Sequence, residues 1–189
     1  MKVLIWITCI GLPIMVSAIE PFNATPEEIQ MCETRVFRRN HGPNDKPGDW
    51  AWQHHHCDGL RFYERAVRTR NDSNDFRYNI QLSLGGFEDV LKRTSPDFSM
   101  RSELMVLQGR TMELAGQGFE AAQLYTTAIQ IDPKFPMAYA ALGNFYAKSG
   151  NIEQALKTYT EGLRRRPNNK YLRSRYTALG GEKLPAQVK

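Results

Sequence analysis

Apolar residues recur along the first half of the chain at spacings of three and four positions, the pattern of a helix with one buried face. A first helix is predicted over 26–38, and a polar loop rich in glycine, proline and asparagine follows it. Asp49 is expected to cap a second helix over 50–69. No stretch alternates between apolar and polar residues with period two, so no strand is predicted.

A third helix is predicted from the apolar pattern over 76–91, where Gly85 and Gly86 are expected to bend the helix or divide it in two. The second half of the chain predicts shorter helices, separated by glycine and proline, which favour helix ends. These helices cover 100–115, 118–131, 135–148, 152–165 and 168–179. The sequence therefore predicts an all-α protein.

Residues 102–135 and 136–169 match each other at a shift of 34 positions. The matched pairs are Gly109/Gly143, Gly116/Gly150, Ala121/Ala155, Tyr125/Tyr159, Ala128/Gly162, Ile129/Leu163 and Pro133/Pro167. Small residues suit a close crossing of two helices, and proline suits the end of a unit. This period and these residues resemble the tetratricopeptide repeat (TPR), which implies helical hairpins stacked as an α-solenoid. Two units are few for such a stack, so the N-terminal helices and the helix over 168–179 are expected to flank it.

The resemblance also implies a binding face, because the first helix of each repeat in this family lines a concave surface. Ten positions correspond: Glu103, Val106, Arg110, Glu113, Leu114, Met137, Ala140, Asn144, Ala147 and Lys148. Arg110, Asn144 and Lys148 could hold a peptide backbone or a carboxylate through charge-assisted hydrogen bonds. The alternative is that these residues only solvate a groove filled by the chain's own termini.

The first eighteen residues have the features of a secretory signal peptide. Lys2 supplies the positive start, residues 3–16 are mostly apolar, and Val16-Ser17-Ala18 is a small-residue cleavage site. Cleavage after Ala18 predicts a periplasmic or secreted protein without a transmembrane segment, and an uncleaved N-terminal anchor is the alternative. The expected organisation is a signal peptide (1–18), an N-terminal helical region (19–96), two repeats with a capping helix (97–181) and a flexible tail (182–189).

The cysteines agree with export. Cys9 would leave with the signal peptide, so that Cys32 and Cys57 remain. An even number of cysteines in an oxidising compartment suggests one disulfide bond, which would link the first two predicted helices.

The segment around Cys57 holds most of the candidate chemistry. His54, His55 and His56 precede the cysteine, and His41 is nearby. Imidazole is a good ligand for zinc or copper, so a periplasmic metal-binding protein is the alternative function. Three consecutive histidines on a helix point about 100° apart, however, and a structural role for this segment is the competing interpretation. The segment also resembles a pattern of Trp, His, Cys, Gly and Leu found before the repeats of small exported bacterial TPR proteins.

No other constellation indicates catalysis, since the chain has no glycine-rich phosphate loop, nucleophile elbow or zinc-protease helix motif. The formal net charge of +5 is mild, and Arg164-Arg165-Arg166 is better explained as a solvated helix end than as a nucleic-acid contact. The sequence thus predicts a non-enzymatic scaffold without a cofactor, which binds a protein or peptide of the cell envelope.

Overall fold

The computed structural model describes residues 24–181, so the signal-peptide and tail predictions lie outside the described residues. The helices are α1 (Pro26–Cys32), α2 (Gln53–Arg68), α3 (Ser73–Arg93), α4 (Arg101–Leu114), α5 (Gly118–Ile131), α6 (Pro136–Lys148), α7 (Ile152–Arg165) and α8 (Lys170–Ala178). A π-helical turn, η1 (Glu33–Phe37), extends α1, and a 3-10 turn, η2 (Asp49–Trp52), precedes α2. The all-α prediction is confirmed.

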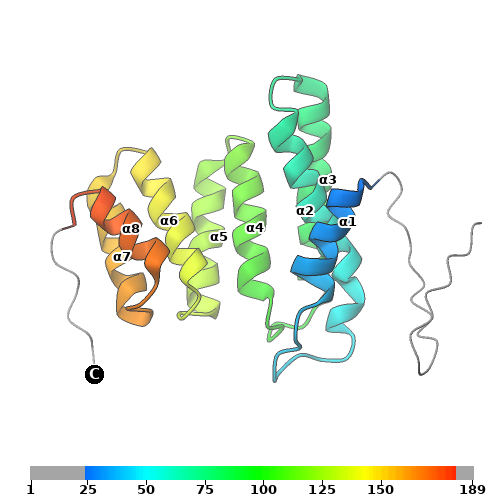
Figure 1. Cartoon of the computed structure of the whole chain (residues 1–189), viewed down its shortest axis with the longest axis horizontal. Helices are drawn as coiled ribbons and strands as arrows, with labels where there is room; N and C mark the ends of the chain where they lie inside the picture. The colour runs from blue at the N-terminus through cyan, green and yellow to red at the C-terminus, as the bar shows by residue number, and fades with distance from the viewer. Residues whose placement is uncertain (1–23, 182–189) are drawn as a thin grey trace, which may run out of the picture.

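Three helical hairpins lie side by side along the long axis of the molecule (Figure 1). They pair α2 with α3, α4 with α5, and α6 with α7, and α8 packs on α7 at the C-terminal end. The second and third hairpins are the two predicted repeats. The first hairpin lacks the repeat's sequence spacing but packs on α4 as a further layer, which is how the two recognisable repeats are flanked on their N-terminal side.

The small residues of the repeat lie where the two helices of a hairpin cross. A side chain at Gly109 would come within 2.5 Å of the ring of Tyr125, and Gly143 stands against Tyr159 in the same way. Both tyrosines are fully buried. Gly116, in the turn between α4 and α5, has a φ of 85°, a conformation that favours glycine. The packing inferred from the repeat is therefore confirmed.

Two local expectations about the N-terminal region were wrong. Helix α3 is not divided at Gly85 and Gly86, since it runs from Ser73 to Arg93. The missing side chain at Gly86 instead lets the backbone of α2 approach closely. Asp49 does not cap the second helix. Its carboxylate accepts hydrogen bonds from the backbone of Lys46 and from the backbone and hydroxyl of Ser95, which tie the loop before α2 to the segment after α3.

Covalent and ionic links fix α1 and η1 on α2. The predicted disulfide between Cys32 and Cys57 is present. Two turns further along α2, Arg65 makes a bidentate ion pair with the buried Glu28, with N–O distances of 2.6 and 2.7 Å. Burial alone would raise the pKa of Glu28, but the hydrogen bonds from Arg65 and from the backbone of Thr25 outweigh it and lower the pKa. The disulfide and this ion pair thus fix α1, and with it the η1 turn that extends it, on α2.

Candidate functional site

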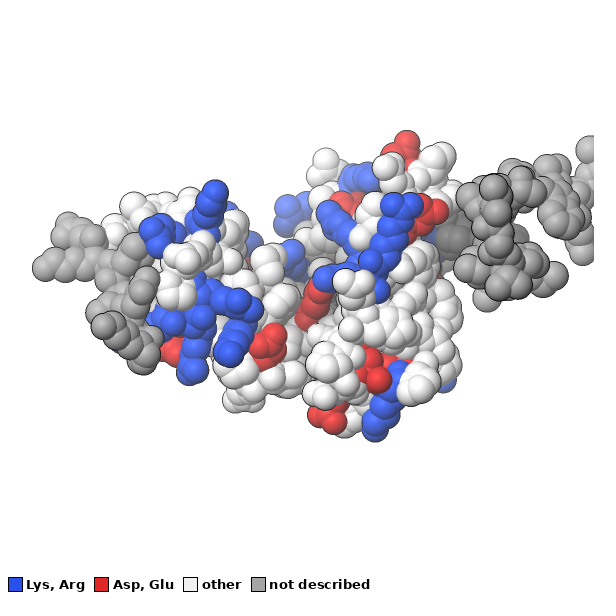
Figure 2. Space-filling model, turned by 60° about the horizontal axis from the view of Figure 1, so that its bottom comes forward, with Lys and Arg blue, Asp and Glu red and all other residues white. Residues whose placement is uncertain are grey.

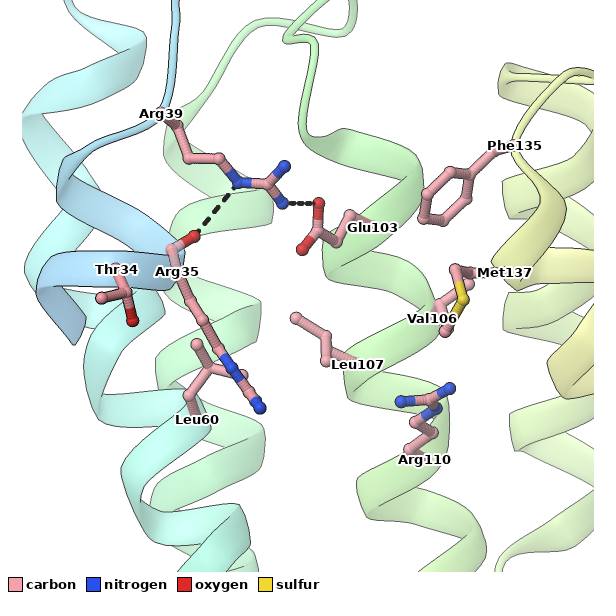
Figure 3. A pocket seen from close by; sticks show the side chains of 10 residues that line it. All are labelled: Thr34, Arg35, Arg39, Leu60, Glu103, Val106, Leu107, Arg110, Phe135 and Met137. Carbon is pink, nitrogen blue, oxygen red and sulfur yellow. Dashed lines mark hydrogen bonds and ion pairs between the residues drawn. The ribbon is translucent and has the colours of Figure 1, made fainter. Parts of the chain in front are cut away.

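Two hollows in the described part of the chain are lined by residues of α4 and α6, the first helices of the two repeats. The larger, which we call the junction pocket, has a volume of about 590 Å³ and lies between η1, α2, α4 and the start of α6 (Figure 3). It is lined by Thr34, Arg35, Arg39, Leu60, Glu103, Val106, Leu107, Arg110, Phe135 and Met137. The smaller, which we call the cap pocket, has a volume of about 250 Å³ and lies between α6, α7 and α8. It is lined by Asn144, Ala147, Lys148, Tyr159, Arg175, Ala178 and Leu179.

Apolar side chains form two sides of the junction pocket. Leu60 enters from α2, and Phe135 and Met137 stand opposite at the start of α6, with Val106 and Leu107 of α4 between them (Figure 3). Phe135 comes directly before Pro136, which begins α6 and prevents the preceding residue from continuing a helix. Met137 remains 38% exposed, so this apolar wall is open to a partner.

Three arginines and one glutamate line the same pocket. Arg39 forms an ion pair with Glu103, and its Nε donates a hydrogen bond to the backbone oxygen of Arg35. Within the described part of the chain, the side chains of Arg35 and Arg110 have neither an ion pair nor a hydrogen bond. Figure 3 shows that they enter the pocket from different elements, Arg35 from η1 and Arg110 from α4. The pocket therefore carries two uncompensated positive charges beside apolar walls.

The cap pocket is built differently, because its polar groups bond to one another. The hydroxyl of Tyr159 donates to the amide oxygen of Asn144 at 2.8 Å, and the amide nitrogen of Asn144 donates to the hydroxyl of Tyr171 at 3.0 Å. Arg175 donates to the same hydroxyl at 3.1 Å. Burial would raise the pKa of Tyr171, but these two donors outweigh it and lower the pKa. This network holds α8 against α6 and α7.

Glu113 of α4 joins the two hairpins between the pockets. Its carboxylate accepts a hydrogen bond from the hydroxyl of Tyr125 at 3.0 Å and pairs with the ammonium group of Lys148 at 2.6 Å. Burial, together with the charge of Glu113, raises the pKa of Tyr125. Because the Lys148 side chain is 72% exposed, that ion pair remains open to solvent.

The ten residues predicted for the concave face are divided between these features. Glu103, Val106, Arg110 and Met137 line the junction pocket, while Asn144, Ala147 and Lys148 line the cap pocket. Glu113 lies between the pockets, Leu114 lines neither, and Ala140 is 1% exposed, within the core beneath α8.

Sequence reasoning missed Arg35 and Arg39, which complete the junction pocket. They lie outside the repeat, so the family's pattern of concave positions could not include them. Their nearness to Cys32 was the available signal, since Arg35 and Arg39 follow it by three and seven residues. A disulfide from Cys32 to Cys57 holds the residues after Cys32 close to α2 and therefore beside the hairpins.

The histidine-rich segment is dispersed in space. His41 stacks on Trp50 at 4.5 Å, His54 and His55 lie against each other near Trp52, and His56 is buried against Phe87. Over residues 24–181, no group of three or more His, Cys, Asp or Glu side chains is placed to hold a metal ion.

His56 has an unusual environment. Its Nε2 is buried without a hydrogen-bond partner, and burial lowers its pKa from about 6.5 to about 4. The ring is therefore neutral at pH 7 and acts as part of the packing against α3.

Comparison with known proteins agrees with the repeat. The model of the tetratricopeptide repeat family matches residues 114–179, from the last residue of α4 to the residue after α8. This segment is therefore similar to the tetratricopeptide repeat. No curated protein matches the chain. Among the described residues, no helix has both the length and the apolar character needed to cross a bilayer.

Two solved structures of TPR domains are similar in shape to this chain. One is the first TPR of Spaghetti (RPAP3) bound to the HSP90 peptide SRMEEVD, which is 14% identical, covers 65% of this chain and 92% of that one, and has a TM-score of 0.47. The other is the second TPR domain of human RPAP3 in complex with the HSP70 peptide SGPTIEEVD, also 14% identical, covering 68% and 99%, with a TM-score of 0.46.

Proposed function

We propose that the protein is a non-enzymatic scaffold that binds an extended segment of another polypeptide along α4 and α6. The observation that carries this proposal is the pair of hollows on one face of the TPR-type array, which together take in seven of the ten positions expected to contact a partner. Apolar walls with a few directed polar groups are the usual composition of a binding cleft. Most titratable groups of this face pair with one another, which suits binding rather than catalysis.

We further propose that this scaffold is exported and serves another protein of the cell envelope. The support is the signal-like pattern of residues 1–18 together with the Cys32–Cys57 disulfide, which requires an oxidising compartment to persist. The mass of the protein recovered from its native compartment tests this directly. A chain beginning at Ile19 is the expected result, and a full-length chain whose three cysteines are all free thiols would contradict it.

Site-directed photo-crosslinking tests the binding face. A photoreactive phenylalanine analogue at Met137 lies on the wall of the junction pocket, whereas the same analogue at Phe119, which is 72% exposed, lies outside both pockets. In cells that express the protein at its natural level, we expect a discrete adduct from position 137 and none from position 119. Adducts of equal yield from both positions, or from neither, would remove the proposed groove.

A further inference from the structure

We infer that the junction pocket recognises an acidic side chain flanked on both sides by apolar residues, within an extended segment of the partner. This inference rests on the proposed polypeptide-binding function and adds the chemistry of the ligand. It concerns a pocket of which one wall comes from η1 and α2, outside the segment that matches the repeat family.

The charge of the pocket selects the acidic group. Arg39 is neutralised by Glu103, whereas the guanidinium groups of Arg35 and Arg110 have no partner among residues 24–181. A guanidinium group offers several N–H donors in a fixed plane, which match the two oxygens of a carboxylate. Two such groups, one from η1 and one from α4 (Figure 3), define a place where one carboxylate is stabilised by both.

The apolar walls select the neighbours of that group. Leu60 lies on the α2 side of the pocket, and Phe135 and Met137 lie on the α6 side, with Leu107 between them. A segment that crosses from α2 to α6 would therefore meet Leu60 beside Arg35, then Leu107 and Arg110 of α4, then Met137 and Phe135 (Figure 3). Apolar contact on both sides means that the chain continues past the carboxylate, so an internal Asp or Glu fits better than a chain end. A volume of about 590 Å³ is within the usual range for a ligand site.

The wider surface favours the same occupant. Lys and Arg side chains gather over the C-terminal end and again over the N-terminal helices, on either side of a hollow in the middle of the face (Figure 2). The whole chain carries a formal charge of +5. The net positive charge of the chain raises the encounter rate with an acidic segment and disfavours a second copy of this basic chain.

Fluorescence anisotropy with two pools of labelled peptides tests the inference. Both pools have amidated ends and a degenerate background, and they differ only in a fixed central Leu-Glu-Leu or Leu-Gln-Leu. We expect the Glu pool to bind about tenfold more tightly, a preference that shrinks as salt is raised. Arg35→Gln and Arg110→Gln should each remove most of the preference while leaving binding of the Gln pool unchanged. Lys157→Gln, which removes an exposed charge of α7 outside both pockets, is the matched control and should keep the preference.

The outcomes separate this inference from the proposed function. Equal binding of the two pools, together with an adduct at position 137, would overturn the acidic preference and leave the scaffold in place. A preference that survives both arginine variants would place the carboxylate elsewhere and also overturns the inference. A ligand-free dimer that Arg110→Gln dissociates would show that a second copy occupies the pocket. If neither pool binds and no adduct forms at position 137, both proposals are wrong.

Discussion

The close approach of α2 and α3 makes a stability prediction with an internal control. Gly85 and Gly86 are neighbours in the middle of α3, and a Cβ atom at each meets a different environment. At Gly86 it would lie 2.6 Å from the backbone nitrogen of Gly59 and 2.7 Å from the backbone oxygen of His55. At Gly85 it would meet nothing within 4 Å. Gly86→Ala and Gly85→Ala therefore add the same methyl group to the same helix, one against a backbone and one into open space.

The magnitude follows from that difference. Both substitutions gain the helix propensity of alanine over glycine, about 0.5–1 kcal/mol. Only Gly86→Ala must also separate two helix backbones by about 0.7 Å to reach ordinary contact, and overpacking of this kind costs about 1–3 kcal/mol or more. The separation would also loosen the hydrogen bond from Ser83 to the backbone oxygen of Gly59. We expect Gly85→Ala to stabilise the protein by about 0.5 kcal/mol and Gly86→Ala to destabilise it by about 2 kcal/mol.

Urea unfolding followed by circular dichroism measures both free energies. The thermal midpoint should shift by about 2–4 °C for each kcal/mol in a protein of this size, upward for Gly85→Ala and downward for Gly86→Ala. If the two variants have the same stability within about 0.5 kcal/mol, the backbones of α2 and α3 do not touch at Gly86, and the account of their close approach is wrong.

Three further predictions concern pH, the disulfide and a surface ion pair. Below pH 6.5 His56 becomes protonated in the unfolded chain but stays neutral in the folded chain, where its pKa is about 4. The free energy of unfolding should therefore fall by about 3 kcal/mol between pH 6.5 and 4, and His56→Leu should lack this part of the pH dependence. Reduction of the Cys32–Cys57 bond, which closes a loop of 25 residues, should lower the urea-unfolding free energy by about 3 kcal/mol; a change below about 1 kcal/mol would contradict the chain-entropy reasoning. Lys148→Gln should cost less than about 0.5 kcal/mol in the same assay, because its ion pair with Glu113 is largely exposed, and a larger loss would mean that the pair is shielded from solvent.

The fold could be predicted from the sequence where equivalent residues of the two repeats make the same packing contact. Gly109 and Gly143 must be small because a tyrosine ring lies against each, so their recurrence reports the crossing of two helices. The pairing of α2 and α3 as a further hairpin could not be predicted in this way. It makes its close crossing with a different pair of glycines, Gly59 and Gly86, at positions that do not follow the 34-residue period. The same geometry was reached with another spacing, so the sequence comparison counted two units where the described chain stacks three hairpins.

The residues of the candidate site could be predicted only in part, for a related reason. The concave positions predicted from the repeat include Arg110, which lines the junction pocket, and Asn144, whose amide is engaged with Tyr159 and Tyr171. Both occupy equivalent positions of their units, so their periodicity could not distinguish an available group from one used to hold the capping helix. Only the arrangement of neighbours outside the repeat separates the two roles.

The N-terminal region therefore does more than cover the end of a helical stack. An arginine on a free segment would lose conformational entropy when it met a carboxylate, which would offset much of the interaction. Arg35 lies one turn after Cys32 on a helix held by the disulfide, by the Glu28–Arg65 pair and by the packing of Val36, which is fully buried. Its backbone is thus fixed before any partner arrives. A repeat array supplies one wall of the junction pocket by stacking, and the second wall exists because a cross-linked segment from outside the repeats is fastened beside it.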